Sequence, residues 1–99
     1  MYHVETRVPT THASRYLQQL CKHWAHKLDV VFTPLAGRVQ FSAKAHCVLT
    51  ADADGLDVLI SAADASEGSR LGRVVIEHLQ RFAFREPFQA PVWRLADAA

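Results

Sequence analysis

The pattern of hydrophobic and polar positions predicts a strand followed by a helix at the start of the chain. Residues 3–8 alternate between apolar and polar side chains, which is typical of a half-buried strand. Pro9 ends this strand, and Thr10 or Thr11 offers an N-cap hydroxyl to a helix. The helix is predicted over residues 11–28, because apolar residues recur there at helical spacing and form a single stripe. The stripe comprises Ala13, Leu17, Leu20, Cys21, Trp24 and Leu28.

The middle of the chain has the pattern of strands joined by short turns. Residues 30–32 form a short β-branched and aromatic run. Every odd position in 38–52 is apolar, and since this stretch exceeds a usual strand we divide it into two strands that turn near 43–45. Asp54-Gly55 is a strong hairpin signal, and a further strand follows it to about Ala62. We therefore predict a four-stranded antiparallel meander.

The last third of the chain predicts a second helix and a returning tail. The helix is expected over residues 66–84 and to end because of Pro87. Its apolar stripe comprises Leu71, Val74, Val75, Leu79 and Phe82. Residues 87–95 are too apolar for a free tail and are expected to pack back on the domain, whereas residues 96–99 are expected to fray.

The order strand, helix, four strands, helix predicts an α+β fold. Each helix has one apolar stripe, so both are expected on one face of a single antiparallel sheet. This order also looks like a TATA-binding-protein-like topology, a likeness of fold that implies nothing about DNA. The length of 99 residues indicates one domain, residues 1–99, with a sufficient core.

Composition and charge narrow the classes of partner. The formal net charge is +1, which argues against nucleic acid or an anionic membrane as the partner. Apolar runs are far shorter than the ~20 residues of a membrane helix, and the N-terminal residues lack the apolar region of a secretory signal. A cytoplasmic location is expected, with Cys21 and Cys47 as buried, reduced thiols.

The histidines are the residues most suggestive of chemistry. His23 and His26 lie on neighbouring rows of the first helix and form a candidate metal pair, but no Cys or His motif elsewhere supplies a further ligand. Solvated histidines at a helix end are the alternative. His78 lies at the edge of the second stripe. One interpretation is a core-rim histidine that bonds to a backbone carbonyl. The alternatives are that it acts as a ligand or as a general base. If the helices lie side by side, His23 and His78 face each other across the groove.

Two helical segments resemble a known family. Residues 16–27 (YLQQLCKHWAHK) and 78–86 (HLQRFAFRE), followed by Trp93, closely resemble the bacterial family called domain of unknown function 2218. The resemblance covers essentially the whole chain, and Trp24 stands where phenylalanine would be expected. The residues that match the family motif are Leu20, Lys22, His23, His26, Lys27, His78, Phe82, Arg85 and Glu86.

The resemblance implies a limited functional setting. Some domains of that family look like modules joined to siderophore-interacting flavoproteins, which are associated with ferric-siderophore reduction. We therefore expect a non-enzymatic binding or accessory domain that handles a small ligand or metal linked to iron–siderophore metabolism, with such a flavoprotein as a partner. Its ligand is expected in the groove between the helices, and the sequence indicates no particular cofactor. The candidate ligand-binding residues are His23, Lys27, His78 and Arg85.

Two other functions remain open. A structural module could dock a protein partner or form a homodimer through a sheet edge or the tail, with Phe84, Phe88 and Trp93 as apolar contacts. A small enzyme could use His78 as its base, but the sequence shows no second catalytic group and no nucleophile or phosphate-loop motif. We predict no catalytic residue.

Overall fold

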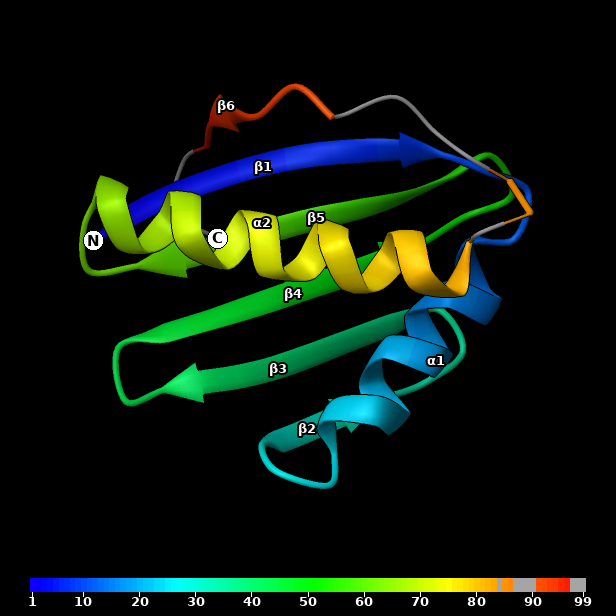
Figure 1. The fold of residues 1–99 in the computed structure, drawn as a ribbon, viewed down its shortest axis with the longest axis horizontal. Helices are drawn as coiled ribbons and strands as arrows, with labels where there is room; N and C mark the ends of the chain where they lie inside the picture. The colour runs from blue at the N-terminus through cyan, green and yellow to red at the C-terminus, as the bar shows by residue number, and fades with distance from the viewer. Residues whose placement is uncertain (84, 87–90, 97–99) are drawn as a thin grey trace.

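A computed structural model describes residues 1–83, 85–86 and 91–96, and these form an antiparallel sheet with two helices on one face (Figure 1). The predicted α+β class, single sheet and order of elements are confirmed. The elements in chain order are β1 (Tyr2–Pro9), α1 (Ala13–Trp24), β2 (Asp29–Phe32), β3 (Ala36–Ser42), β4 (Ala45–Ala51), β5 (Gly55–Ala62), α2 (Ala65–Phe82) and β6 (Arg94–Leu95).

The strand order in the sheet is β2-β3-β4-β5-β1-β6. Strands β2 to β5 are the predicted meander, because each pairs with its neighbour along the chain. The turn between β3 and β4 falls at residues 43–44, as predicted. Strand β1 pairs with β5 along its whole length, from Tyr2 opposite Ala62 to Pro9 opposite Gly55. The first strand of the chain therefore lies beside the last strand of the meander.

The core lies between the sheet and the two helices, where the alternating apolar positions of the strands meet the helical stripes. Cys21 and Cys47 are buried there as free thiols, as predicted. Burial raises the pKa of the Cys21 thiol to about 11, so this thiol stays protonated and unreactive at neutral pH. The largest fully buried side chains include Leu17, Leu20, Leu49, Leu56, Ile60 and Leu79.

The bounds of α1 differ from the prediction at both ends. His12 is the N-cap residue, and the predicted cap Thr10 instead accepts a hydrogen bond from the His12 N–H at 3.0 Å. The helix ends at Trp24, and residues 25–28 form a turn in which the Leu28 N–H donates to the Trp24 carbonyl at 2.8 Å. Leu28 still packs against the core. Its apolar character therefore extended the predicted helix past the real end.

Helix α2 begins and ends earlier than predicted. The carboxylate of Asp64 accepts from the Glu67 N–H at 2.9 Å and caps the helix, so α2 starts at Ala65. The helix ends at Phe82, and the predicted end at Phe84 lies outside the described residues. No helix in the described part of the chain is long and apolar enough to cross a membrane.

The C-terminal segment returns to the sheet, as predicted, for its described residues. Strand β6 pairs with β1 and places Leu95 opposite Val4, while the Thr6 hydroxyl donates to the Val92 carbonyl at 2.8 Å. The predicted fraying is wrong for Ala96, because its N–H donates to the His3 carbonyl at 3.0 Å. Residues 87–90 and 97–99 lie outside the described residues.

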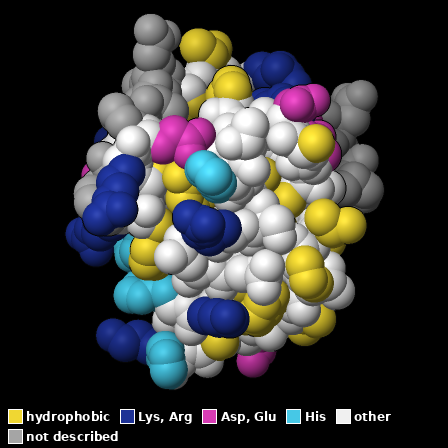
Figure 2. Space-filling model, turned by 90° about the vertical axis from the view of Figure 1, so that its right-hand side faces the viewer, with side chains coloured by type: hydrophobic (Ala, Val, Ile, Leu, Met, Phe, Trp, Pro, Cys, Tyr) yellow, Lys and Arg dark blue, Asp and Glu magenta, His cyan; other side chains and the backbone are white. Residues whose placement is uncertain are grey.

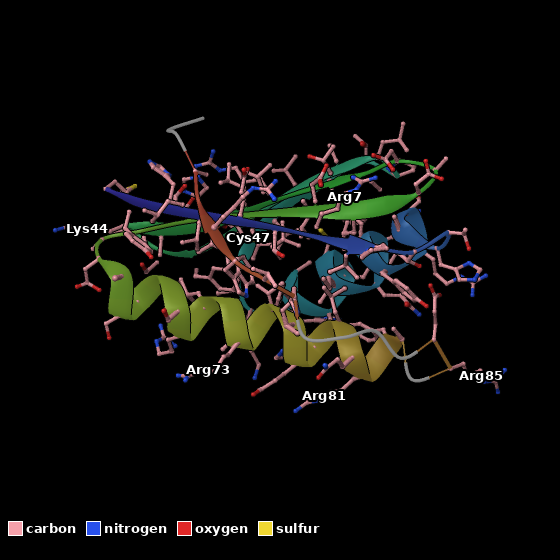
Figure 3. The ribbon with its side chains drawn as sticks, turned by 90° about the horizontal axis from the view of Figure 1, so that it is seen from above. Arg7, Lys44, Cys47, Arg73, Arg81 and Arg85 are labelled. Atoms are coloured by element: carbon pink, nitrogen blue, oxygen red, sulfur yellow. The ribbon has the colours of Figure 1, made fainter. Side chains whose placement is uncertain are left out.

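An arginine on the face of the sheet opposite the helices joins β1 to β5 and to the turn that precedes β5. Figure 3 shows Arg7 on the side of the sheet away from α2. Its guanidinium donates to Asp52 at 2.8 Å and to Asp57 at 3.0 Å. The hydrogen bond from Arg7 to Asp52, with those from the backbone N–H groups of the turn, holds the pKa of Asp52 at about 2. The turn between β4 and β5 is thus tied to β1.

Candidate functional site

His23 and His78, from different helices, lie together in the structure. His23 is in the last turn of α1 and is exposed, whereas His78 is half-buried on α2. Their ring centroids are 5.2 Å apart, with the ring planes inclined at 48°. The predicted approach of these two side chains across the helix groove is therefore present. We call them the histidine pair.

The hydrogen bond of His78 determines which ring nitrogen is available. Its Nδ1 lies 2.7 Å from the Val74 carbonyl oxygen. A carbonyl oxygen can only accept, so Nδ1 carries the proton and donates. In the neutral ring the lone pair is then on Nε2. A hydrogen bond from the other ring nitrogen to a backbone carbonyl is also how metal-binding histidines are held in proteins.

Aromatic side chains surround the histidine pair. The Trp24 ring lies 5.1 Å from the His78 ring and 5.3 Å from the ring of Phe41, which belongs to β3. The Phe82 ring lies 6.1 Å from that of His23. Trp24 is almost fully buried, so it fixes the position of His78 from below. The pair therefore rests on a rigid aromatic base and opens to solvent on the His23 side.

Lys27 and His26 do not join the histidine pair. Both lie in the turn after α1 and are exposed. Lys27 lines a separate hollow of about 440 Å³ together with Asp29 and Gln40. Within the described residues, no three or more His, Cys, Asp or Glu side chains are placed to hold a metal ion. The His23–His26 metal pair remains a prediction, without a third protein ligand from the described chain.

Arg85 belongs to a different hollow, at the end of the groove where α1 begins and α2 ends. Figure 3 shows its side chain extending past the end of α2. We call this the helix-junction hollow; its volume is about 360 Å³. Figure 2 looks onto this end of the molecule and shows basic, acidic and histidine side chains close together. The lining residues are His12, Arg15, Tyr16, Gln19, Phe82, Arg85 and Glu86.

Tyr16 and Glu86 form the hydrogen-bonded centre of this hollow. The Tyr16 hydroxyl donates to Glu86 Oε2 at 2.8 Å, and His12 Nε2 lies 3.8 Å from the same oxygen. Hydrogen bonds from Thr10 and Tyr16 lower the pKa of Glu86, while burial and the Glu86 carboxylate raise the pKa of Tyr16. Glu86 also brings a negative charge to the first turn of α1, which has no acidic residue of its own.

Comparison with models of known protein families identifies the family of this chain. The model of a family described as "Uncharacterized protein conserved in bacteria (DUF2218)" matches residues 5–94. The chain belongs to this family. The resemblance expected from the helical motifs is therefore confirmed, and the DUF2218 match spans both the histidine pair and the helix-junction hollow.

A solved structure is similar to this DUF2218 domain over almost its whole length. It is the NMR structure of PA4090 from Pseudomonas aeruginosa, with 34% sequence identity and a TM-score of 0.81. The match covers 95% of this chain and 96% of that chain. None of the curated proteins compared with the chain matches it. These comparisons establish the family and the fold, and they name no activity.

The sequence did not predict the Tyr16–Glu86 contact of this DUF2218 domain. Tyr16 is nearly fully buried beside the predicted apolar stripe, so its hydroxyl needs a partner. That partner comes from 70 positions along the chain. No periodic pattern links residues this far apart. The one available signal was a tyrosine directly beside an apolar helical stripe.

Replacing Tyr16 with phenylalanine tests this contact. We expect the free energy of unfolding to fall by about 1 kcal/mol at pH 7, a modest value because the Glu86 carboxylate is partly exposed. Because the folded-state pKa of Glu86 is lowered, its contribution is present above its unfolded value and is lost as the pH falls. Because the folded-state pKa of Tyr16 is raised, the contribution of Tyr16 to stability is lost as the pH rises above the pKa of tyrosine in the unfolded chain.

The unfolding free energies of the wild type and of Tyr16→Phe should therefore differ most between about pH 5 and 9. They should converge on either side of this window. Urea unfolding followed by circular dichroism, at intervals from pH 3 to 11, measures both curves. Gln19→Ala, which changes another residue of the same hollow, is the matched control and should lie parallel to the wild type. A difference that stays constant with pH would assign the effect of Tyr16→Phe to packing alone.

Proposed function

We propose that this DUF2218 domain is a cytoplasmic binding domain that holds a transition-metal ion, or a small chelate of one, at the histidine pair. One observation carries the proposal: His23 and His78 converge from two helices, and the hydrogen bond to Val74 leaves the His78 Nε2 lone pair available. Imidazole nitrogen suits iron, zinc and copper ions. Two buried free thiols agree with a reducing compartment.

The small number of protein ligands favours a bound chelate over a structural metal site. A closed structural site needs about four protein ligands, and a catalytic site about three. Two imidazoles leave most coordination positions to oxygen or nitrogen atoms of the cargo. The half-buried ring of Phe82, next to His23, offers apolar surface to a flat chelating group.

An iron–siderophore setting is part of the same proposal. It is supported by the resemblance of such domains to modules joined to siderophore-interacting flavoproteins. A flavoprotein of that class would supply the redox chemistry, and this domain would hold or deliver the metal. Within the described residues no carboxylate is paired with His78, so the proposal assigns the histidine pair to binding and not to acid–base catalysis.

Zinc titration of the untagged protein tests the histidine pair. We expect His23→Gln and His78→Gln each to weaken Zn²⁺ binding by about tenfold or more, because each removes one ligating nitrogen. Glutamine at position 78 can still donate to the Val74 carbonyl, so the fold should be kept. Isothermal titration calorimetry measures the affinity, and a Co²⁺ titration followed by visible absorption reports imidazole coordination.

Two further variants make this test specific. His12→Gln changes a histidine outside the pair and should leave Zn²⁺ affinity unchanged, while His26→Gln examines the alternative His23–His26 pair. A loss in His26→Gln but not in His78→Gln would favour that alternative and overturn the proposed pair. Failure of the wild type to bind Zn²⁺ would overturn the metal proposal. The ferric complex of 2,3-dihydroxybenzoate, titrated in the same way, tests the siderophore part separately.

A second candidate is a protein interaction module without a ligand. Large apolar side chains are exposed at both edges of the sheet: Val31 is 77% exposed on β2, and Leu95 is 72% exposed on β6. An edge strand with unpaired backbone groups can pair with another chain. Of the predicted contacts, Trp93 is half-buried, while Phe84 and Phe88 lie outside the described residues. Light scattering across a range of protein concentrations distinguishes a homodimer from a monomer.

A further inference from the structure

A third hollow lies on the side of α2 away from the histidine pair, between the N-terminal half of this helix and the outer edge of the sheet. Figure 1 shows this part of α2 running alongside β1, with β6 on the outer side of that strand. We call the hollow the Trp93 groove. Its main part has a volume of about 320 Å³, and Tyr2, Val4, Trp93 and Leu95 provide its apolar wall. A smaller space of about 180 Å³ continues past Trp93 along the helix.

Two glycines of α2 create this groove. Gly68 and Gly72 are one helical turn apart, so they lie on the same face of the helix. A Cβ at Gly68 would lie 2.8 Å from Tyr2 Cδ1, and one at Gly72 would lie 3.1 Å from Trp93 Cζ2. Glycine inside a helix costs about 1 kcal/mol relative to alanine. Here its absent side chain lets two aromatic rings lie against the helix backbone, with the groove beside them.

The groove has the properties of a small-molecule site. Its volume lies at the lower end of the range for ligand pockets, roughly 300–1,000 Å³. Tyr2 and Trp93 are only half-buried, so their rings present apolar surface to solvent. Aromatic side chains bind flat rings well, by stacking or edge contacts. An aromatic ligand would remove this apolar surface from water.

The charged residues at the rim of the groove indicate the sign of the ligand's charge. Arg94 is held by Glu5, with Nε 3.0 Å from Oε1, and that pair is neutral overall. Arg73 lines both parts of the groove and forms no ion pair with any described residue. Figure 3 shows Arg73 projecting from the side of α2 away from the sheet, at the outer rim. Ser69 adds a hydroxyl beside it. Glu77 lines the smaller space only. The main part of the groove therefore offers one cation without an ion pair among the described residues, and one hydrogen-bond donor.

We propose that the Trp93 groove binds a small aromatic monocarboxylate. The ring packs against Tyr2 and Trp93, and the carboxylate accepts from the Arg73 guanidinium, which is the geometry that arginine favours for carboxylates. This site is independent of the histidine pair, since α2 separates the two. A ligand of this class would be held by apolar contact and one charge, with an expected dissociation constant of about 1 mM or tighter.

The probe for the test is 2-naphthoate, and 2-naphthalenemethanol is its neutral counterpart. Titration into ¹⁵N-labelled protein should move the indole N–H signal of Trp93 and the amide signals of Gly68 and Gly72, and leave those of His23 and His78 in place. We expect Arg73→Gln to weaken naphthoate binding by about fivefold to tenfold. The same variant should leave binding of the alcohol unchanged. Arg81→Gln, an equal change of charge on α2 outside the groove, is the matched control.

A variant that fills the groove completes the experiment. Ser69→Leu starts from an exposed helical position and should abolish binding of both probes while the protein stays folded by circular dichroism. Shifts that persist in Ser69→Leu, or that map outside the Trp93 groove, would overturn the site. Equal binding of acid and alcohol, unaffected by Arg73→Gln, would overturn the assignment to a carboxylate. Absence of any shift in the wild type would overturn the whole proposal.

Discussion

Replacing Trp24 with alanine should lower the free energy of unfolding by about 3–5 kcal/mol. The Trp24 ring is nearly fully buried at the end of α1, and it contacts Phe41 of β3 and His78 of α2. One side chain therefore joins α1 to the sheet and to the second helix. Removal would leave a cavity at the point where these three elements meet. In a domain of this size the melting temperature should fall by more than about 10 °C.

Trp24→Phe is the matched control, and we expect it to cost about 1–1.5 kcal/mol. Phenylalanine is also the residue that the family resemblance led us to expect at this position. It keeps an aromatic face against His78, so Zn²⁺ binding at the histidine pair should survive. Urea unfolding followed by circular dichroism measures both variants. A cost below about 1 kcal/mol for Trp24→Ala would contradict the role given to this ring.

The strands were predictable because their side chains alternate strictly. Val39, Cys47 and Leu49 all point toward the helices, and a shift of one residue in register would turn each of them to the opposite face. Burial of one face therefore specifies both the strands and their pairing. Strand β6 shows the limit of this reasoning. It consists of Arg94 and Leu95, both exposed, and its pairing with β1 leaves no periodic pattern in the sequence.

The prediction of the histidine pair rested on helical geometry together with one assumption. Periodicity places His23 and His78 at the edges of their apolar stripes. Whether the two stripe edges meet depends on how α1 and α2 lie on the sheet, and that depends on the packing of side chains from every element. The assumption that the helices lie side by side is correct near these two residues, where Trp24 packs between α1 and α2.

Lys27 and Arg85 were grouped with the histidine pair because both match the family motif and are polar residues near the edges of the apolar stripes. In a helix reaching residue 28, Lys27 would lie one turn beyond His23 on the same face. The real helix ends at Trp24, and the following turn carries Lys27 toward β3 instead. Arg85 follows the end of α2 at Phe82 and therefore lines the helix-junction hollow. The ends of the two helices thus decide which of the four candidate residues lie together, and a sequence motif does not reveal those ends.

Replacing Gly37 with alanine should also destabilise the protein, by about 1–3 kcal/mol. Gly37 lies in β3 beneath α1, and a Cβ there would be 2.8 Å from Cys21 Sγ and 3.4 Å from Leu17 Cδ2. None of the described glycines has a positive φ, so alanine is compatible with the backbone. At such a position the change would normally stabilise a protein by about 0.4–1 kcal/mol, through the unfolded state. A loss of stability would therefore come from the contact with α1.

A double-mutant cycle with Cys21→Ala isolates that contact. Removal of Sγ makes room for the new methyl group, so Gly37→Ala should cost much less in the Cys21→Ala background, with a coupling energy of about 1–2 kcal/mol. The same close approach seats α1 on β3 and so helps to place His23 against His78. The single variant Gly37→Ala should then also weaken Zn²⁺ binding, and Cys21→Ala should restore it. An equal cost in both backgrounds would show that α1 adjusts freely, and that Gly37 does not help to position the histidine pair.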